Sequence, residues 1–277
     1  MRNTALLIAI LLLGSGLSIA AEVETFHAYV DSDLCARLML GPITEARVDC
    51  STKTSKEGAS PVLVRLKDNG VLEVNKRKMV KKLVGQFAKA TGETKEKAGR
   101  IKLQSVEPVE RSAIPKGEPG SELLDVRNFR TDEGLYELVR HELAMMPYIS
   151  QFDFISFTML GNNVILTGWT IRSTNRSGAY NRVKNIEGVG HITNNIDVLP
   201  LGRTDMQIRA GARARLQQHL SRYFWGSGSD IKIIVKNGNI ILLGTVTRQA
   251  DSDIASLQCG LVRGAFHVFN MLRVEPS

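Results

Sequence analysis

The sequence predicts an α+β protein that contains tandem small α-β-β-α-β sandwiches, each a helix pair packed on a three-stranded sheet. Two observations carry this prediction. One is an internal repeat with a fixed shift, and the other is apolar spacing that switches between helix and strand periods inside each copy. The chain has 277 residues, of which 43% are hydrophobic and 23% are charged. This globular composition leaves room for two or three small domains.

The repeat can be followed without a gap. The segment 163–168, NVILTG, recurs at 239–244 as NIILLG, a shift of 76 positions (163 to 239). The same shift relates further identical pairs: Arg172 and Arg248, Ala179 and Ala255, Gly188 and Gly264, His191 and His267, Asn194 and Asn270, Val198 and Val274. One register that persists across a strand, a helix and a second strand indicates a duplication.

Each copy shows the same order of elements. Apolar residues spaced for one helical face predict a first helix in each copy, with Asp132 and Asp205 as caps. Turn-forming residues at 161–163 and 237–239 then predict a hairpin. The expected strands and second helices are 152–158, 164–170, helix 175–186 and 192–199 in the first copy, and 231–236, 240–246, helix 251–262 and 268–275 in the second.

Alternate apolar residues of these strands are expected to form the core. We expect Ile165 and Ile196 in the first copy to line the sheet face that the helices cover. Ile241 and Leu272 are expected to do the same in the second copy.

The two copies resemble the BON domain, a module of osmotically induced periplasmic and nodulation proteins of bacteria. The resemblance covers about residues 132–276. It rests on an apolar strand that ends in glycine, at Gly168 and Gly244, and on a closing Gly-x-x-His-(Ile/Val)-x-Asn pattern at 188–194 and 264–270. The second copy departs from the family pattern at Ala265, where valine is usual. The resemblance implies a periplasmic binding module that contacts phospholipid surfaces.

The first twenty residues have the features of an export signal. Arg2 supplies a positive charge, residues 6–13 are apolar without interruption, and Ser18 and Ala20 are the small residues that a signal peptidase requires. The apolar run is too short to span a bilayer. We therefore expect a periplasmic protein whose signal peptide is cleaved near Ala20. A retained N-terminal anchor is the alternative.

The region between the signal and the repeats is harder to assign. Apolar spacing predicts a helix at 31–40, a strand at 43–52, a hairpin at 61–74, a helix at 76–90 and a strand at 100–106. This order is also α-β-β-α-β, so a diverged third copy is one interpretation, although the glycine and histidine patterns are absent. The expected domains are a signal peptide at 1–20, an N-terminal α/β domain at 21–111, a linker at 112–131, and BON-like domains at 132–201 and 205–276.

Three cysteines follow the signal. Cys35 and Cys50 fall in one predicted domain, the first on a helix and the second on the strand after it. They can form a disulfide if their Cα atoms lie within about 7 Å, and export permits such a bond. Two buried thiols are the alternative. Cys259 has no expected partner, and the spacing of the three cysteines matches no metal site.

Positive charge is unevenly distributed along the chain. The formal net charge is +8; basic residues outnumber acidic ones in the second copy, and the reverse holds in the first. A basic surface concentrates anionic partners such as phospholipid head groups, whereas a general solubility charge is the alternative. The candidate lipid- or anion-binding residues are Lys78, Lys81 and Lys82 in the N-terminal domain, and Arg209, Arg213 and Arg215 on the first helix of the second copy.

The predicted helix at 76–90 is amphipathic. Val80, Leu83, Val84 and Phe87 share one face, and six basic residues occupy the rest. Such a helix can lie on an anionic membrane. The same apolar stripe is also typical of a helix that packs on a sheet, and we favour the packed interpretation.

An aromatic segment follows the first helix of the second copy. Tyr223, Phe224 and Trp225 precede Gly226 and are suited to the interfacial zone of a membrane. They are candidate lipid-binding residues for that reason. The alternative, which we favour slightly, is that they cap the hydrophobic core.

No catalytic or metal-binding arrangement stands out in the sequence. His191 and His267 occupy the same place in two copies of opposite charge, so a structural role is expected for them. The remaining histidines have no metal-ligand spacing, and no glycine-rich phosphate loop or nucleophile elbow is present. We therefore expect no enzyme activity, no cofactor, no nucleic-acid partner and no small-molecule substrate.

Two hypotheses of function remain. The first is an exported envelope protein whose modules contact anionic phospholipid surfaces and support envelope integrity under osmotic or similar stress. The second is a protein–protein scaffold or docking subunit of an envelope assembly.

Overall fold

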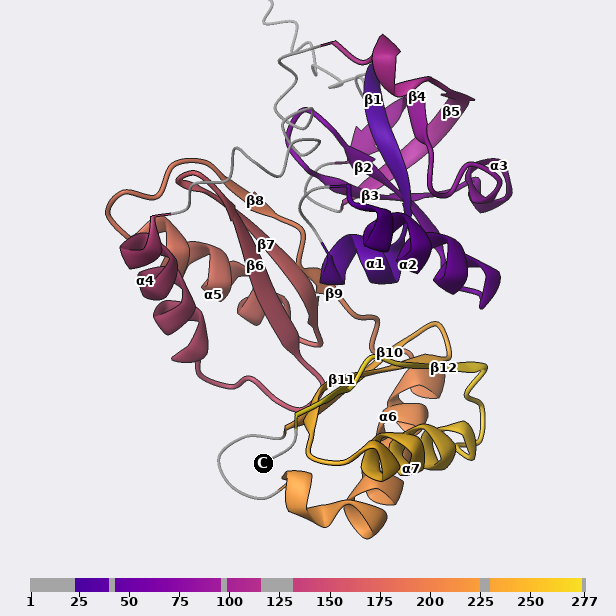
Figure 1. The fold of residues 1–277 in the computed structure, drawn as a ribbon, viewed down its shortest axis with the longest axis vertical. Helices are drawn as coiled ribbons and strands as arrows, with labels where there is room; N and C mark the ends of the chain where they lie inside the picture. The colour runs from indigo at the N-terminus through magenta and orange to yellow at the C-terminus, as the bar shows by residue number, and fades with distance from the viewer. Residues whose placement is uncertain (1–22, 40–42, 96–98, 116–131, 225–229, 276–277) are drawn as a thin grey trace, which may run out of the picture.

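The structure is a computed structural model, and it describes residues 23–39, 43–95, 99–115, 132–224 and 230–275. Three units are arranged around a common centre (Figure 1). We call them the barrel domain (23–115), the first sandwich (132–200) and the second sandwich (203–275). The expected signal peptide and most of the expected linker lie outside the described residues.

The barrel domain is a closed five-stranded barrel with the strand order β1-β2-β3-β5-β4. β1 pairs with both β2 and β4 and so closes the sheet, while β3 and β5 pair in parallel. Small Greek-key barrels such as the OB-fold have this architecture. Its elements are β1 (Val23–Ser32), α1 (Asp33–Leu38), α2 (Glu45–Lys56), β2 (Pro61–Arg65), β3 (Val71–Val74), α3 (Arg77–Lys81), β4 (Phe87–Lys95), β5 (Arg100–Pro108) and the short helix η2 (Arg111–Ala113).

The strand expected at 43–52 is wrong, because this segment is the helix α2. Thr44 caps the helix, its side chain accepting a hydrogen bond from Arg47 N. Arg47 and Ser51, one turn apart, both donate to the buried carboxylate of Asp31 on β1. In a strand these two residues would lie about 13 Å apart and could not share one carboxylate. Apolar periodicity does not detect a helix whose buried face is polar.

The helix expected at 76–90 is also wrong over most of its length. α3 ends at Lys81, Gly85 adopts a φ of +89°, and β4 follows. Ala88 and Ala90 are buried on either side of the exposed Lys89, which is the period of a strand. The hairpin at 61–74 and the strand at 100–106 are confirmed as β2–β3 and β5.

The α-β-β-α-β order expected for 21–111 is therefore wrong as well. A strand, β1, precedes the first helix, and the sheet closes into a barrel. The helix expected at 31–40 is shorter, because β1 extends to Ser32. This topology differs from that of the repeats, so it does not support a diverged third copy.

Cys35 and Cys50 form a disulfide, with their Cα atoms 6.1 Å apart. The bond joins α1 to α2, because Cys50 lies on a helix and not on the expected strand. Cys259 is buried and unpaired. Burial raises the pKa of the Cys259 thiol to about 12, so it stays protonated as a small apolar side chain.

The two sandwiches confirm the predicted α-β-β-α-β fold. In each, the last strand is split into two short pieces that both pair in parallel with the central strand. The first sandwich contains α4 (Glu133–Ala144), β6 (Phe154–Leu160), β7 (Asn163–Thr170), α5 (Ser173–Lys184), β8 (Ile192–Asn194) and β9 (Asp197–Val198). The second contains α6 (Arg203–His219), η5 (Ser221–Phe224), β10 (Ile231–Lys236), β11 (Asn239–Val246), α7 (Gln249–Gly260), β12 (His267–Asn270) and β13 (Arg273–Val274).

The repeat pairs occupy equivalent places. Gly168 lies opposite Ile155 in the first sheet, and Gly244 lies opposite Ile231 in the second. Both glycines have positive φ, +114° and +109°, and a Cβ on either would lie within 2.0 Å of a carbonyl oxygen of the neighbouring strand. Only glycine fits such a position, which explains why the strand-end glycine recurs.

Of the two predicted helix caps, one is confirmed and the other is wrong. Asp132 caps α4, because its side chain accepts a hydrogen bond from Leu135 N. Asp205 lies inside the first turn of α6, which has Gly202 as its N-cap. Its carboxylate instead accepts hydrogen bonds from Asn237 N and Gly238 N, in the hairpin turn between β10 and β11. The cap expected at Asp205 is therefore wrong.

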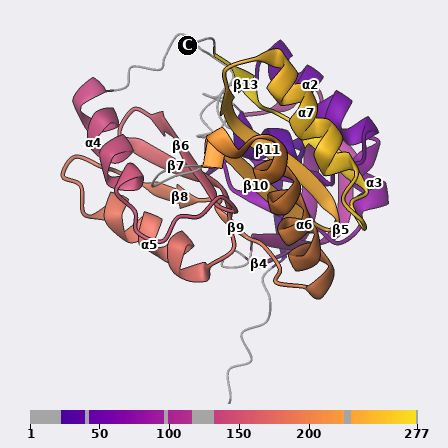
Figure 2. The same ribbon diagram turned by 90° about the horizontal axis from the view of Figure 1, so that it is seen from below.

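Both sheets of the sandwiches are covered on two faces, and not on the helix-covered face alone. Ile196 packs under the helices of the first sandwich and Leu272 packs at the helix-covered core of the second, as expected. Ile165 and Ile241 point the other way. Ile165 packs against the barrel domain, and Ile241 belongs to an apolar cluster with residues from all three domains. Figure 2 shows α6 and α7 on the near side of the second sheet and the barrel domain behind it.

That shared cluster forms the centre of the molecule. Leu34 comes from the barrel domain, Trp169 from the first sandwich and Ile234 from the second, and all are at most 2% exposed. Burial of such side chains contributes roughly 1.5–3 kcal/mol each. The three domains therefore share one core in addition to their own.

A network of buried charges lies beside the shared core. Lys236 Nζ from the second sandwich is 2.9 Å from Asp33, 2.5 Å from Glu73 and 2.7 Å from Asp197. Asp33 and Glu73 belong to the barrel domain, and Asp197 belongs to the first sandwich. Arg37 on α1 also pairs with Asp33 at 2.7 Å. We call these five residues the ionic junction.

The ionic junction shifts the ionisation of its members. Burial alone would raise the pKa of Asp33, but the neighbouring Arg37 and Lys236 hold it below its usual value. Burial alone would lower the pKa of Lys236, but the attraction of Asp33, Asp197 and Glu73 outweighs it and raises the pKa. Both groups are therefore held in their charged forms.

Replacing Lys236 tests the ionic junction. We expect Lys236→Ala to lower the free energy of unfolding by about 3–5 kcal/mol, because it removes the one ammonium group that three close carboxylates share. Urea denaturation measures this loss. Lys67→Ala, which removes an exposed pair with Glu24, is the matched control and should cost no more than about 1 kcal/mol.

The effect of Lys236→Ala should depend on pH in a defined window. The lowered pKa of Asp33 gives stability that is present above about pH 4 and is lost as the pH falls through the folded-state pKa. The raised pKa of Lys236 gives stability that is present below about pH 10 and is lost as the pH rises through its folded-state pKa. A difference between wild type and variant that is unchanged far into acid would contradict this account.

Candidate functional site

The candidate site lies along α6, beside the stripe of the helix that packs in the core of the second sandwich. Ile208, Ala212 and Leu216, spaced at three and four residues, are buried in the core of the second sandwich. The helix also touches residues that precede it and residues of the first sandwich. Three parts of the chain thus form a shallow apolar groove along α6.

This groove has a volume of about 300 Å³ and is mostly apolar. Met206 and Leu201, 53% and 61% exposed, provide much of its apolar surface. We call it the α6 groove, and it is lined by Phe152, Ile171, Leu201, Met206, Arg209, Ala210, Arg213, Ala214 and Gln217. Phe152 precedes β6 and Ile171 follows β7, so both lie at the open end of this hairpin of the first sandwich.

Arg209 places a buried positive charge in the wall of the α6 groove. It is only 4% exposed, and its guanidinium bonds to carbonyl oxygens: Nη2 donates to Val235 O at 2.7 Å, and both terminal nitrogens lie 3.3 Å from Pro200 O. Nε has no hydrogen-bond partner among the described residues. Burial lowers the pKa of Arg209, but guanidinium groups stay charged in proteins. The prediction that Arg209 is a surface residue is therefore wrong.

The other two predicted arginines of α6 differ from each other. Arg213 lies one turn beyond Arg209 and is exposed at the rim of the α6 groove. Arg215 is half-buried on another side of the helix and donates to Gln258 Oε1 of α7 at 3.2 Å. Of the three predicted arginines, Arg209 and Arg213 come together at one site and Arg215 does not.

The predicted lysines belong to a different surface. Lys78, Lys81 and Lys82 are exposed on and just after α3 in the barrel domain. Val80 is fully buried, and Leu83 packs against the barrel core. The apolar stripe of this segment therefore packs inside the protein, while its lysines are exposed to solvent and can contact an anionic surface.

The aromatic segment caps the core of the second sandwich. Tyr223 is 4% exposed, and its hydroxyl donates to Asp251 at 2.7 Å and accepts from Thr247 N at 3.0 Å. Phe224 is partly buried against the same core. A lipid-binding residue would have to be exposed, so the expectation that Tyr223 binds lipid is wrong. Trp225 lies outside the described residues.

The repeated asparagines have a structural role. Asn194 Nδ2 donates to Arg176 O, and its Oδ1 accepts from Ile196 N. Asn270 makes the equivalent bonds to Ser252 O and Leu272 N. Each asparagine therefore ties the split last strand to the second helix of its own sandwich.

The repeated histidines and glycines do not share the paired hydrogen bonds that the repeated asparagines make. His191 is exposed, and His267 lies 3.9 Å from Glu57 of the barrel domain. Gly188 and Gly264 have positive φ and face Leu135 and Ile208 of the first helices. These positions keep the loop before the last strand close to the first helix.

One group of carboxylates has the spacing of a metal site. Oxygens of Asp33, Glu73 and Asp197 lie within 4.8 Å of one another. Lys236 Nζ, however, contacts all three within 2.9 Å. The ammonium group thus occupies the position that a cation would need.

The comparisons with known proteins identify the repeats. The BON domain family matches residues 131–200 and residues 207–276, which together make up half of the chain. The chain belongs to the BON domain family. We therefore call the first sandwich BON1 and the second BON2. This family consists of binding domains and not enzymes, and its presence is consistent with a role at the bacterial envelope.

Two solved structures of CdsD, a structural protein of the type III secretion system of Chlamydia trachomatis, also match. The C-terminal domain of CdsD is 11% identical, with 52% of this chain and 99% of that chain covered and a TM-score of 0.22. The second structure is 12% identical, with 52% and 93% covered and a TM-score of 0.21. No match was found among curated proteins.

None of the helices within the described residues has both the length and the apolar character needed to cross a membrane.

Sequence reasoning missed most of the α6 groove. Phe152 and Ile171 lie in BON1, at least thirty positions before the residues of α6. Their proximity depends on how the two BON domains pack. The available signal was Met206 and Leu201, apolar residues outside the buried stripe of α6, which indicate a second apolar surface.

The two arginines of the α6 groove should differ in their effect on stability. We expect Arg209→Met to lower the free energy of unfolding by about 1–3 kcal/mol, because Val235 O and Pro200 O lose their buried donor. Arg213→Met should change it by no more than about 0.5 kcal/mol. Urea denaturation of both variants measures the difference, and equal effects would show that the bonds of Arg209 are not structural.

Proposed function

We propose that this chain is an exported envelope protein that binds anionic phospholipid surfaces through the α6 groove of BON2 and supports envelope integrity under osmotic stress. The supporting observation is an exposed apolar groove that carries two arginines one helical turn apart. Among the described residues, the hydrogen bonds of the Arg209 guanidinium go to carbonyl oxygens, while Asp205 and Asp153 attract its charge from nearby.

The chemistry of the α6 groove suits the boundary between lipid head groups and acyl chains. Leu201 and Met206 offer apolar surface to the acyl region, and burial of an apolar side chain contributes up to roughly 1.5–3 kcal/mol. Arg213 at the rim can donate two parallel hydrogen bonds to one phosphate. Each basic side chain near an anionic surface adds about 1 kcal/mol.

An envelope location is part of this proposal. The export signal expected at 1–20, the disulfide between Cys35 and Cys50, and the BON domains all agree with it. Disulfides persist outside the cytoplasm, where glutathione does not reduce them. Docking of a protein partner is the second candidate function, and it is favoured by β12, an edge strand of the BON2 sheet that lines a groove.

Vesicle sedimentation tests the proposed membrane contact. We expect the full mature chain to sediment with vesicles that contain phosphatidylglycerol but not with pure phosphatidylcholine, and to be released as salt screens the charges. The double variant Met206→Ser with Arg213→Gln should reduce binding severalfold, because it removes both the apolar and the charged contact.

Two further variants make this test specific. Arg172→Gln, at an exposed position of BON1, is the matched control and should bind like the wild type. A triple change of Lys78, Lys81 and Lys82 to glutamine measures the separate contribution of α3. If the α6 double variant sediments as well as the wild type, the α6 groove is not the contact surface.

A further inference from the structure

BON1 and BON2 present the same sheet edge to the barrel domain, but the BON1 edge is tied to it by hydrogen bonds. Asn195, between β8 and β9, meets the turn that joins β2 to β3. Its Nδ2 donates to Asn69 O at 2.7 Å, and its Oδ1 accepts from Val71 N at 2.9 Å. Thr193 Oγ1 donates to Asp68 O at 2.9 Å. These contacts fix the BON1 edge against the barrel.

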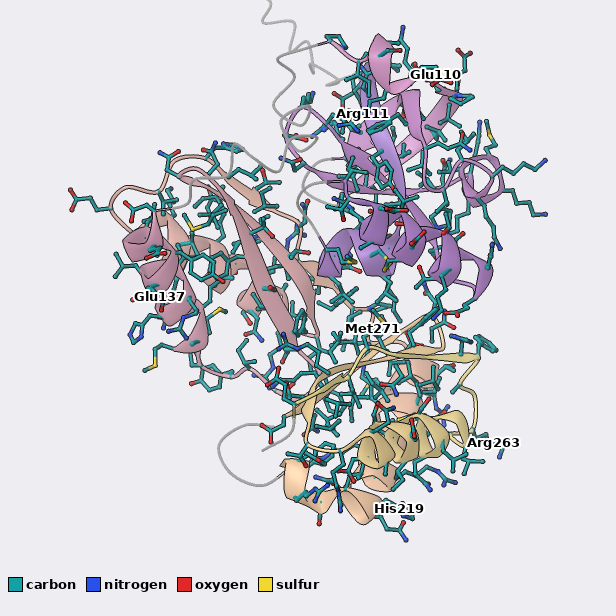
Figure 3. The ribbon with its side chains drawn as sticks, viewed as in Figure 1. Glu110, Arg111, Glu137, His219, Arg263 and Met271 are labelled. Carbon is teal, nitrogen blue, oxygen red and sulfur yellow. A yellow bond between two sulfur atoms is a disulfide. The ribbon has the colours of Figure 1, made fainter. Side chains whose placement is uncertain are left out.

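The equivalent positions have changed in BON2. The shift of 76 positions relates Thr193 to Phe269 and Asn195 to Met271. Neither replacement can form these hydrogen bonds. Phe269 packs into the shared core, and Met271 lies at the side of BON2 that faces the barrel domain (Figure 3).

A groove of about 460 Å³ separates the BON2 edge from the barrel domain. One wall is β12, and the other is α2 of the barrel domain, which presents Ala46, Asp49, Lys53 and Glu57 along one helical face. The stretch from Ala46 to Glu57 is about 17 Å long, enough for an extended segment of about five residues. We call this space the edge groove.

The β12 wall offers main-chain hydrogen-bonding groups. β12 pairs in parallel with β11 along one side, and Met271 N donates to Leu242 O. Since alternate residues of a strand turn their main chain to opposite sides, the N–H and C=O groups of Val268 and Asn270 point into the edge groove. Among the described residues, one polar contact joins β12 to α2, that of His267 with Glu57.

We propose that the edge groove binds an extended peptide segment of a partner protein, which adds as a further strand beside β12 and lies along α2. An open strand edge next to a helix is the arrangement used for recognition by strand addition. The donors and acceptors of Val268 and Asn270 match the repeating groups of another main chain. This proposal does not depend on the phospholipid contact, because the α6 groove lies beside β10, the other edge strand of the BON2 sheet, and shares no lining residue with the edge groove.

The α2 wall indicates the kind of peptide. Asp49 and Glu57 carry two negative charges against the single positive charge of Lys53, so a basic side chain is favoured between them. Cys50 on the same wall is bonded to Cys35 of α1. This bond holds α2 in place, and a rigid wall reduces the entropy lost on binding.

Selection from a displayed library of random peptides of about ten residues tests the proposal on the full mature chain. The affinity of a selected peptide is then measured by fluorescence anisotropy. Ala46→Trp should fill the edge groove and weaken binding by about tenfold or more, a change of about 1.4 kcal/mol. Glu45→Trp, at the adjacent exposed position outside the groove, is the matched control and should bind as the wild type does.

A second pair of variants tests the main-chain contact. Val268→Pro removes the N–H group that faces the edge groove but no donor of the β11 ladder, whereas Val268→Ala keeps that group. We expect Val268→Pro alone to weaken binding by about tenfold or more. Since proline can also disturb the fold, a selected peptide with methylated main-chain nitrogens repeats the test on unchanged protein, and it should bind as weakly.

Several results would overturn the proposal. They are a library that yields no binding peptide, a peptide that binds Ala46→Trp as well as it binds Glu45→Trp, and undiminished binding of the methylated peptide. Ala46→Trp should still sediment with anionic vesicles, so a failure here is distinguishable from a failure of the phospholipid proposal.

Discussion

Lys236 places one ammonium group among three carboxylates, and the arrangement of the three domains depends on this contact. Asp33 and Glu73 come from the barrel domain, Asp197 comes from BON1, and Lys236 ends a strand of BON2. A buried charge without its partner costs several kcal/mol, so no domain can move away without a large loss. The α6 groove and the edge groove both lie between domains, and the ionic junction keeps their walls in place.

The duplicated modules have kept their internal contacts and changed their external ones. The strand-end glycine and the asparagine that ties the last strand to the second helix recur in both copies, because each forms a contact inside its own module. Asp197, which joins the ionic junction, corresponds to Arg273 in BON2, which is exposed. Two copies of one fold therefore present the same edge with different side chains to the barrel domain. Within the described part of the chain, hydrogen bonds join the BON1 edge to the barrel domain, whereas none crosses the edge groove of BON2.

Much of the fold could be predicted because its signals are local. The hairpin turns, the strand-end glycines and the order of elements in both BON domains are confirmed. The secondary structure of the barrel domain was predicted less accurately. Its helix α2 buries Arg47 and Ser51 against Asp31, and β4 buries alanines, so the apolar periodicity that identifies helices and strands is weak in both. The predicted sheet face was correct for Ile196 and wrong for Ile165. The strand that carries Ile165 is buried on both faces, so its sequence does not show which residues face the helices.

The sequence by itself determined the two BON domains, since the contacts that define each one lie within about seventy consecutive residues. It also identified Arg209 and Arg213 as neighbours, because one helical turn separates them. Tertiary structure alone decided that Arg209 is buried and Arg213 exposed, that Phe152 completes the α6 groove, and that α2 faces β12. The physical reason is that burial and proximity between domains depend on which surfaces exclude water together, and residues far apart in the chain form those surfaces.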